Sequence, residues 1–181
     1  MGAAVVAVSI AAGGGPVRAE PLITEVRIGA AYHDAGVFGN RKEDGGNLNL
    51  ETRFRPFGFT RVIFSPRPTI GGSINLSGHT NQLYLGLTWS FQDILVDGLY
   101  ADLFLGGAVH DGVLSSSDPS EIRQRKQLGS RLLFREAVEV GWRFSGGHRI
   151  GVFLDHISNA NLASNNEGLD TLGIRYGFDF N

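Results

Sequence analysis

Three side chains near the end of the chain could together carry out nucleophilic catalysis. His156 and Ser158 lie two positions apart, and Asp170 follows twelve residues after the serine. A serine hydroxyl attacks an ester when a nearby base takes its proton, and a histidine can be that base. A carboxylate bound to the histidine holds the imidazole in the required tautomer and stabilises its charged form. These residue types predict a serine-hydrolase triad with Ser158 as nucleophile, His156 as base and Asp170 as acid.

The local pattern places these three residues on one surface. Alternate residues of a strand face the same side, so His156 and Ser158 continue the apolar face of a predicted strand at 148–158. Asp170 begins the apolar face of a predicted strand at 169–180. The two strands form a hairpin, so the three side chains come together near one rim. Residues i and i+2 are about 7 Å apart at the backbone, so the side chains must lean together to react.

A simpler interpretation treats each of these residues as an ordinary polar group in a wet rim. The other four histidines are interpreted in that way, as rim, loop or lumen residues without a role; they are His33, His79, His110 and His148. Glu167 is interpreted as a loop residue, because its parity and spacing do not suit the acid of the triad.

The elements that must position these residues are strands. Apolar and polar residues alternate in eight segments of about ten residues, which is the length of a tilted strand that crosses a membrane. The segments are roughly 22–32, 47–57, 69–77, 81–91, 98–110, 131–144, 148–158 and 169–180. Turn-forming breaks such as Asp44-Gly45-Gly46 and Ser145-Gly146-Gly147 separate them. The fold class predicted is all-β, an eight-stranded antiparallel transmembrane β-barrel of the outer-membrane type.

Alternation alone does not distinguish a membrane barrel from a soluble barrel of the lipocalin type. Two further features favour the membrane. The even-numbered segments end in aromatic residues that would form a girdle at one interface, namely Phe54/Phe57, Trp89/Phe91, Trp142/Phe144 and Phe178/Phe180. The polar face carries glycines and charges of both signs that could pair inside a narrow barrel, namely Glu25, Arg27, Glu51, Arg53, Arg135, Glu139, Arg175 and Asp179.

The connections agree with this orientation, with one exception. The long polar segments at about 33–46 and 111–130 fall at the outer end, and the tight turn at 145–147 falls at the periplasmic end. The chain ends one residue after an aromatic residue, Phe180, which resembles the C-terminal signature of outer-membrane barrels. The stretch 58–67 is long for a periplasmic turn, and its Val62-Ile63-Phe64 is expected either to extend a strand or to touch the membrane.

Composition excludes several classes of protein. Hydrophobic residues make up 42% of the 181 residues, yet beyond the N-terminus no apolar run approaches the roughly 20 residues of a spanning helix. A formal net charge of −2 argues against a nucleic-acid partner. The absence of cysteine excludes disulfides and thiolate metal sites.

The N-terminus is predicted to be a signal peptide. An apolar run at 3–12 precedes Val17-Arg18-Ala19, which fits cleavage after Ala19, although the usual positive residues before the run are missing. We therefore expect residues 1–19 to be the signal peptide and 20–181 to be a single barrel.

The motif around the predicted triad resembles one family. His156-Ile157-Ser158-Asn159-Ala160, followed by Asn166-Glu167-Gly168-Leu169-Asp170, is similar to the signature of the PagL-type lipid A 3-O-deacylases, which are eight-stranded outer-membrane barrels. The close match is confined to the C-terminal hairpin. The resemblance implies Ser158 as nucleophile, His156 as base, and Asn159 and Asn166 as oxyanion or site-supporting residues. The family has a Glu at the position of Asp170, and the Asp side chain is one methylene shorter than that Glu.

The resemblance implies an enzyme of the outer membrane. The expected reaction is hydrolysis of an ester-linked acyl chain of lipid A, a component of lipopolysaccharide in the outer leaflet, with no metal or organic cofactor. Several alternatives stay open: a non-enzymatic structural or adhesive barrel that acts through the loop at 111–130, a soluble lipid-binding barrel, an esterase for another membrane lipid, and an inactive family member. The sequence leaves the oligomeric state open, a homo-oligomer included.

Overall fold

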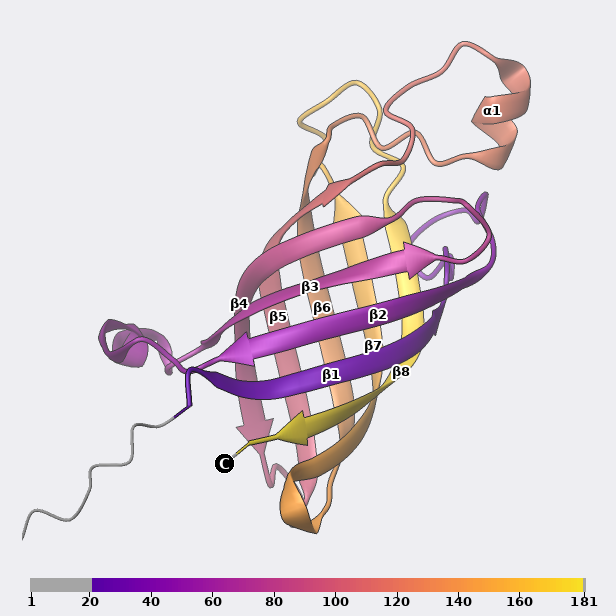
Figure 1. Ribbon diagram of the computed structural model, residues 1–181. Coiled ribbons are helices and arrows are strands. Elements are labelled where there is room, and N and C mark those ends of the chain that lie inside the picture. The colour runs from indigo at the N-terminus through magenta and orange to yellow at the C-terminus, as the bar shows by residue number, and fades with distance from the viewer. Residues whose placement is uncertain (1–20, 181) are drawn as a thin grey trace, which may run out of the picture.

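Segments with alternating apolar and polar side chains form antiparallel strands that close into a barrel (Figure 1). This computed structural model describes residues 21–180. The predicted signal peptide at 1–19 therefore lies outside the described residues. The elements in chain order are β1 (Ile23–Tyr32), β2 (Gly46–Phe54), η1 (Gly58–Ile63), β3 (Arg67–Asn75), β4 (Gln82–Gln92), β5 (Leu99–His110), α1 (Pro119–Gln124), β6 (Leu132–Arg143), η2 (Ser145–Gly147), β7 (His148–Ser158) and β8 (Leu169–Asp179).

Each strand pairs with its neighbour in sequence, and β1 pairs with β8 to close the barrel. The predicted fold class is thus confirmed, and the strand boundaries agree to within a few residues. No helix within residues 21–180 is both long and apolar enough to cross a membrane.

The barrel interior is filled with paired charges. The Arg27 guanidinium donates to Asp102 Oδ2 over 2.7 Å, and Arg53 donates to the same oxygen over 2.7 Å. Arg175 binds Glu51 at 3.1 Å and Glu139 at 3.2 Å. Charges removed from water are tolerable only when they are paired in this way. The prediction of an ion-paired lumen is therefore confirmed, with Asp102 as a member that the sequence analysis did not name.

The outer wall is apolar. Large exposed side chains follow the outward positions of every strand, for example Leu50 on β2, Leu85 on β4 and Val140 on β6. The predicted aromatic girdle lies where β2, β4, β6 and β8 end. This distribution is the reverse of a soluble protein and is the one that a bilayer requires.

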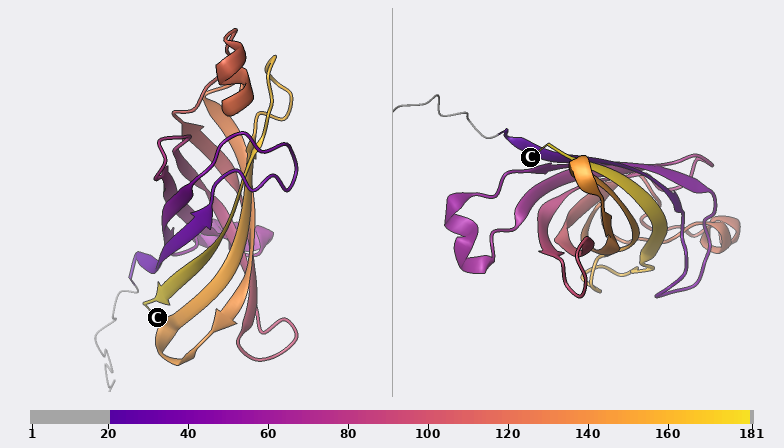
Figure 2. Two further views of the ribbon diagram at one scale, coloured as in Figure 1. Left: turned by 90° about the vertical axis from the view of Figure 1, so that its right-hand side faces the viewer. Right: turned by 90° about the horizontal axis from the view of Figure 1, so that it is seen from below.

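The connections differ between the two ends of the barrel. The loops 33–45, 76–81, 111–131 and 159–168 lie at one end, with α1 within the third of them (Figures 1 and 2). The connection that contains η1, the turn at 93–98 and η2 lie at the opposite end of the barrel, where β8 also ends (Figure 1). Gly146 and Gly147 adopt positive φ angles of 76° and 84°, which a tight turn requires and glycine adopts without strain.

The connection between β2 and β3 corrects one part of the prediction. The strand expected at 47–57 ends at Phe54, because Pro56 has no backbone N–H to continue the ladder. Residues Gly58–Ile63 then form a 3₁₀ helix, and Phe64 ends it with a left-handed φ of 66°. The alternative that Val62-Ile63-Phe64 extends a strand is therefore wrong.

Candidate active site

His156 and Asp170 are in direct contact across the last hairpin. They are register partners on β7 and β8, and His156 Nδ1 lies 2.6 Å from Asp170 Oδ1. Both point to the outward face, as the alternation predicted. The imidazole is 26% exposed, whereas the carboxylate is 2% exposed. The imidazole can therefore meet a molecule beside the barrel while the acid that orients it stays dry.

A loop from the other end of the chain covers Asp170. The backbone N–H of Phe38 donates to Asp170 Oδ2 over 2.7 Å, and that of Ala35 donates to the Asp170 carbonyl over 2.8 Å. The Phe38 ring also packs edge-on against His156, with ring centroids 5.4 Å apart. These contacts explain how an acid on the lipid-facing side becomes buried. The sequence analysis missed Phe38, because no local signal links this loop to residues so distant in the chain.

The covering loop is itself held by a buried carboxylate, Glu43. Burial disfavours its charged form, but hydrogen bonds from His33, Thr80 and the Lys126 backbone outweigh burial and hold the pKa of Glu43 at about 2. Glu43 also pairs with Arg125 at 3.1 Å. The loops at 33–45 and 111–131 are thus fastened together above the barrel.

Ser158 lies on the same outward face as His156, at the end of β7. It is half-buried and pairs in register with Phe134 of β6. Within residues 21–180 its hydroxyl makes no hydrogen bond, to His156 or to any other group. The structure therefore brings two of the predicted triad residues into contact and places the third two positions along the same face.

Asn159 and Asn166 hold the loop that joins β7 to β8. The Asn159 amide donates to the Leu128 and Asn165 carbonyls, over 2.9 and 2.5 Å. The Asn159 backbone N–H donates to Asn166 Oδ1 over 2.8 Å. In this arrangement both side chains support the site by fixing the segment directly after Ser158.

Two further residues flank the imidazole. An added Cβ at Gly168 would lie 2.4 Å from His156 Cε1, so only glycine fits beside the ring in its present position. On the other side of β7, Glu136 of β6 is the exposed register partner of His156. Glu167 does not contact His156; it pairs with Lys42 and accepts the Gln127 N–H, as a loop residue would.

A groove of about 590 Å³ lies on the outer wall and is lined at one point by Asn159, the residue that follows Ser158. Its lining includes Gly107 of β5, Phe134 of β6 and Leu162 of the last loop. Gly107 pairs with Phe134, which in turn pairs with Ser158, so the groove runs across the strands from the serine. Most of its lining is apolar, which suits a hydrocarbon chain.

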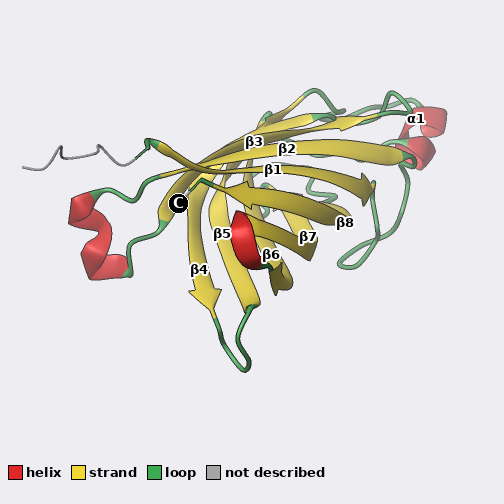
Figure 3. Ribbon diagram, turned by 60° about the horizontal axis from the view of Figure 1, so that its bottom comes forward, coloured by secondary structure: helices red, strands yellow, loops and turns green. Residues whose placement is uncertain are grey.

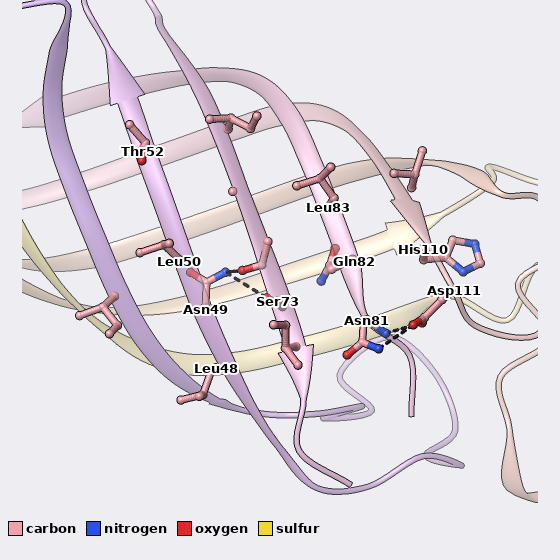
Figure 4. A pocket seen from close by; sticks show the side chains of 16 residues that line it. Leu48, Asn49, Leu50, Thr52, Ser73, Asn81, Gln82, Leu83, His110 and Asp111 are labelled. Carbon is pink, nitrogen blue, oxygen red and sulfur yellow. Dashed lines mark hydrogen bonds between the residues drawn. The ribbon is translucent and has the colours of Figure 1, made fainter. Parts of the chain in front are cut away.

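A second hollow, of about 730 Å³, lies on the wall formed by β1 to β5 (Figure 4). Leucines such as Leu48, Leu50 and Leu83 line it, and Asn81 and Asp111 are hydrogen-bonded to each other at one end (Figure 4). None of the predicted site residues lines this hollow. Although this hollow is larger, the groove next to Asn159 is the better candidate for a substrate, because it lies beside the predicted triad.

The part of the chain that the structure describes holds no group of three or more His, Asp or Glu side chains arranged to bind a metal ion. The arrangement of an imidazole, a buried carboxylate and a hydroxyl on one face is suited to nucleophilic attack on an ester.

Comparisons with known proteins agree with this geometry. A sequence model described as "Lipid A 3-O-deacylase (PagL)" matches residues 68–179. The crystal structure of the outer-membrane enzyme PagL is similar with a TM-score of 0.62 and 17% identity, over 86% of this chain and 99% of that one. Among curated proteins, no sequence matches this chain.

Two other solved structures share the barrel fold. A de novo designed transmembrane β-barrel has a TM-score of 0.53 at 12% identity, over 88% of this chain and 96% of that one. The N-terminal β-barrel domain of Pseudomonas aeruginosa OprF has a TM-score of 0.52 at 12% identity, over 87% and 98%.

Proposed function

The chain belongs to the PagL family of lipid A 3-O-deacylases, and from this premise we propose that it hydrolyses the ester-linked acyl chain at position 3 of lipid A with a Ser158–His156–Asp170 triad. It is an outer-membrane β-barrel. The observation that carries the proposal is the 2.6 Å contact between His156 and Asp170 on the lipid-facing side, with Ser158 on the same face.

The reaction follows from these positions. His156 Nε2 takes the proton of the Ser158 hydroxyl while Oγ attacks the ester carbonyl carbon. Asp170 accepts the Nδ1–H bond and stabilises the imidazolium that forms. The sugar oxygen leaves with the proton from His156, and the acyl chain remains on Ser158. Water, deprotonated by His156, then releases the fatty acid and restores the serine.

The position of the site suits a substrate that never leaves the membrane. Lipid A lies in the outer leaflet beside the barrel, and the groove next to Ser158 opens sideways on the wall. The acyl chain to be cleaved would lie in this groove with its ester at the serine. Asn159 and Asn166 would support the segment beside the oxyanion, where donors matter most.

The alternative of an adhesive surface loop receives less support. Two of the basic residues in the loop at 111–131 are engaged internally. Arg125 pairs with Glu43, and Lys126 is buried and pairs with Asp34 at 3.2 Å. That loop therefore fastens the outer end of the barrel, and of the basic residues in its segment Arg123-Gln124-Arg125-Lys126 only Arg123 is exposed.

The direct test is incubation of detergent-purified protein with lipid A, followed by mass spectrometry. We expect the mass of one ester-linked acyl chain to be lost and the corresponding free fatty acid to appear. Phospholipid is the comparison substrate. If the protein cleaves phospholipid and leaves lipid A intact, the proposed substrate is wrong and the enzyme is an esterase for another membrane lipid.

Replacement of Gly107 by Leu is expected to change the preferred chain length. A Cβ at Gly107 meets only ordinary contacts at 3.5 and 3.6 Å, so the side chain would enter the groove without distorting the strand. Long acyl chains should then be cleaved about tenfold more slowly, while shorter ones keep their rate, since a few lost methylene contacts cost about that much. Rates on lipid A with different acyl lengths measure this.

Val140→Leu, on the same wall but distant from Ser158, is the matched control and should leave the preference unchanged. An equal loss for all chain lengths in Gly107→Leu would mean that the groove does not hold the acyl chain.

Replacement of Gly168 by Ala is expected to lower kcat by about 10²-fold, because a displacement of about 1 Å in a catalytic group has that effect. The added methyl would occupy the space of His156 Cε1 and push the ring from its position. The barrel should remain as stable as before. Gly58→Ala is the control, since a Cβ there meets nothing within 4 Å. A Gly168→Ala variant with normal kcat would contradict the position assigned to the imidazole.

A further inference from the structure

The connection between β2 and β3 exposes several large apolar side chains at the surface of the barrel. We call residues 57–64 the lateral helix, because they comprise η1 and its two flanking residues. Phe59 is 77% exposed, Val62 87% and Phe64 88%, and only Thr60 of η1 is buried. Such a cluster is costly in water and marks a surface that contacts something else.

The lateral helix is held in a defined shape although its apolar side chains are exposed. The Phe57 and Phe59 rings stack at 5.4 Å, and the Thr60 hydroxyl donates to the Phe57 carbonyl over 2.7 Å. Trp89 of the aromatic girdle donates through Nε1 to the Ile63 carbonyl over 2.7 Å. The exposed apolar surface of the lateral helix is therefore ordered, and it is continuous with the lipid-facing wall.

The position of the lateral helix on the barrel indicates which leaflet of the membrane it contacts. The lateral helix projects sideways from the ends of β2 and β3, on the side of the molecule opposite to α1 (Figures 1 and 3). In the proposed function, on which this inference rests, the hairpin that carries Ser158 closes at the end where α1 lies and meets lipid A in the outer leaflet. A segment that extends sideways from the opposite end therefore meets the inner leaflet, which consists of phospholipid.

The positive charge of the lateral helix is suited to the phospholipid headgroups of the inner leaflet. Arg61 is exposed in the middle of the lateral helix, and the stretch 55–66 contains no acidic residue. A segment that combines exposed aromatic residues with a cation is typical of the boundary between headgroups and acyl chains.

We propose that the lateral helix is an interfacial anchor that lies in the inner leaflet of the outer membrane, with its aromatic side chains among the acyl chains and Arg61 on anionic phospholipid headgroups. The anchor fixes the depth of the barrel, so that the rim with Ser158 stays at the level of the ester bonds in the outer leaflet.

The absence of cysteine allows a sharp test. Single Phe64→Cys and Val62→Cys variants of the full chain carry a nitroxide label and are inserted in vesicles of phosphatidylethanolamine and phosphatidylglycerol. Electron paramagnetic resonance then compares the accessibility of each label to oxygen, which concentrates in the bilayer, and to a water-soluble nickel chelate. Val140→Cys on the lipid-facing wall and Ser117→Cys in the outer loop are the two references, and heat-modifiable migration in gels verifies folding.

The oxygen-to-nickel ratio at positions 62 and 64 is expected to match that at Val140 and to exceed that at Ser117 several-fold. Arg61→Glu should lower this ratio in the anionic vesicles and not in vesicles of phosphatidylcholine alone, whereas Arg61→Lys should preserve it. A ratio like that of Ser117 would overturn the proposal. Spectral broadening between labels on different molecules would assign the surface to a second copy of the chain and would overturn it as well.

Discussion

Ser158→Ala is expected to abolish the loss of the acyl chain from lipid A, with a rate reduced by about 10³-fold or more. Removing the nucleophile of a triad leaves only the catalysis that the remaining site provides by binding and charge stabilisation. Mass spectrometry of lipid A over time measures the residual rate. The substitution removes one oxygen that has no hydrogen-bond partner within residues 21–180, so the barrel should fold as before.

The control is Ser117→Ala, an exposed serine of the outer loop, which should keep full activity. Retention of activity in Ser158→Ala would show that another group is the nucleophile. Inactivity of the unaltered protein on lipid A, with folding verified in gels, would instead contradict the substrate and leave phospholipid hydrolysis as the next assay.

Asp170→Asn is expected to lower kcat by about 10² to 10⁴-fold with little change in KM. Asparagine is nearly the same size and keeps an oxygen to accept the Phe38 N–H, so the covering loop should stay in place. It has no charge to stabilise the imidazolium and can hold the ring in the wrong tautomer. Steady-state kinetics on lipid A separate kcat from KM and distinguish this effect from a loss of binding.

Two further variants sharpen this second prediction. His156→Ala combined with Asp170→Asn should be no slower than His156→Ala alone, because residues that act as a unit are not additive. Asp170→Glu tests the family's own acid: the longer side chain must displace the loop at 33–45, so we expect lower activity than Asp170 supports. A loss of less than tenfold in Asp170→Asn would mean that another carboxylate orients His156, and Glu136 on β6 would be the first to examine.

His156, Asp170 and the loop that covers them show how much of the candidate site could be predicted from the sequence. His156 and Asp170 lie in one hairpin, so their shared face followed from the parity of two adjacent strands, and their contact in the structure agrees with it. The burial of Asp170 did not follow, because parity assigned it to the lipid-facing side. It is buried because Ala35 and Phe38, more than 130 positions away, fold over it.

In the interior of the barrel, too, the sequence predicted which way side chains point but not which residues they contact. Alternation predicted which charged side chains point inward, and these do form the lumen network. Which acid meets which base depends on register and closure, so the contact of Arg27 with Asp102 was not predictable. At the β2–β3 connection, Pro56 was the signal that the strand ends, but the predicted strand at 47–57 extended past this proline, whereas β2 ends at Phe54.

The sequence by itself determined the number of strands, their two faces and the hairpin that carries the predicted triad, because a period of two along the chain is a local property that does not depend on which strands are neighbours. The tertiary structure decided which loop covers Asp170, which groove adjoins Ser158 and where the lateral helix projects. These features depend on how strands and loops pack in three dimensions, for example the closing of β1 against β8 that brings the loop at 33–45 next to Asp170, and no local pattern relates such residues.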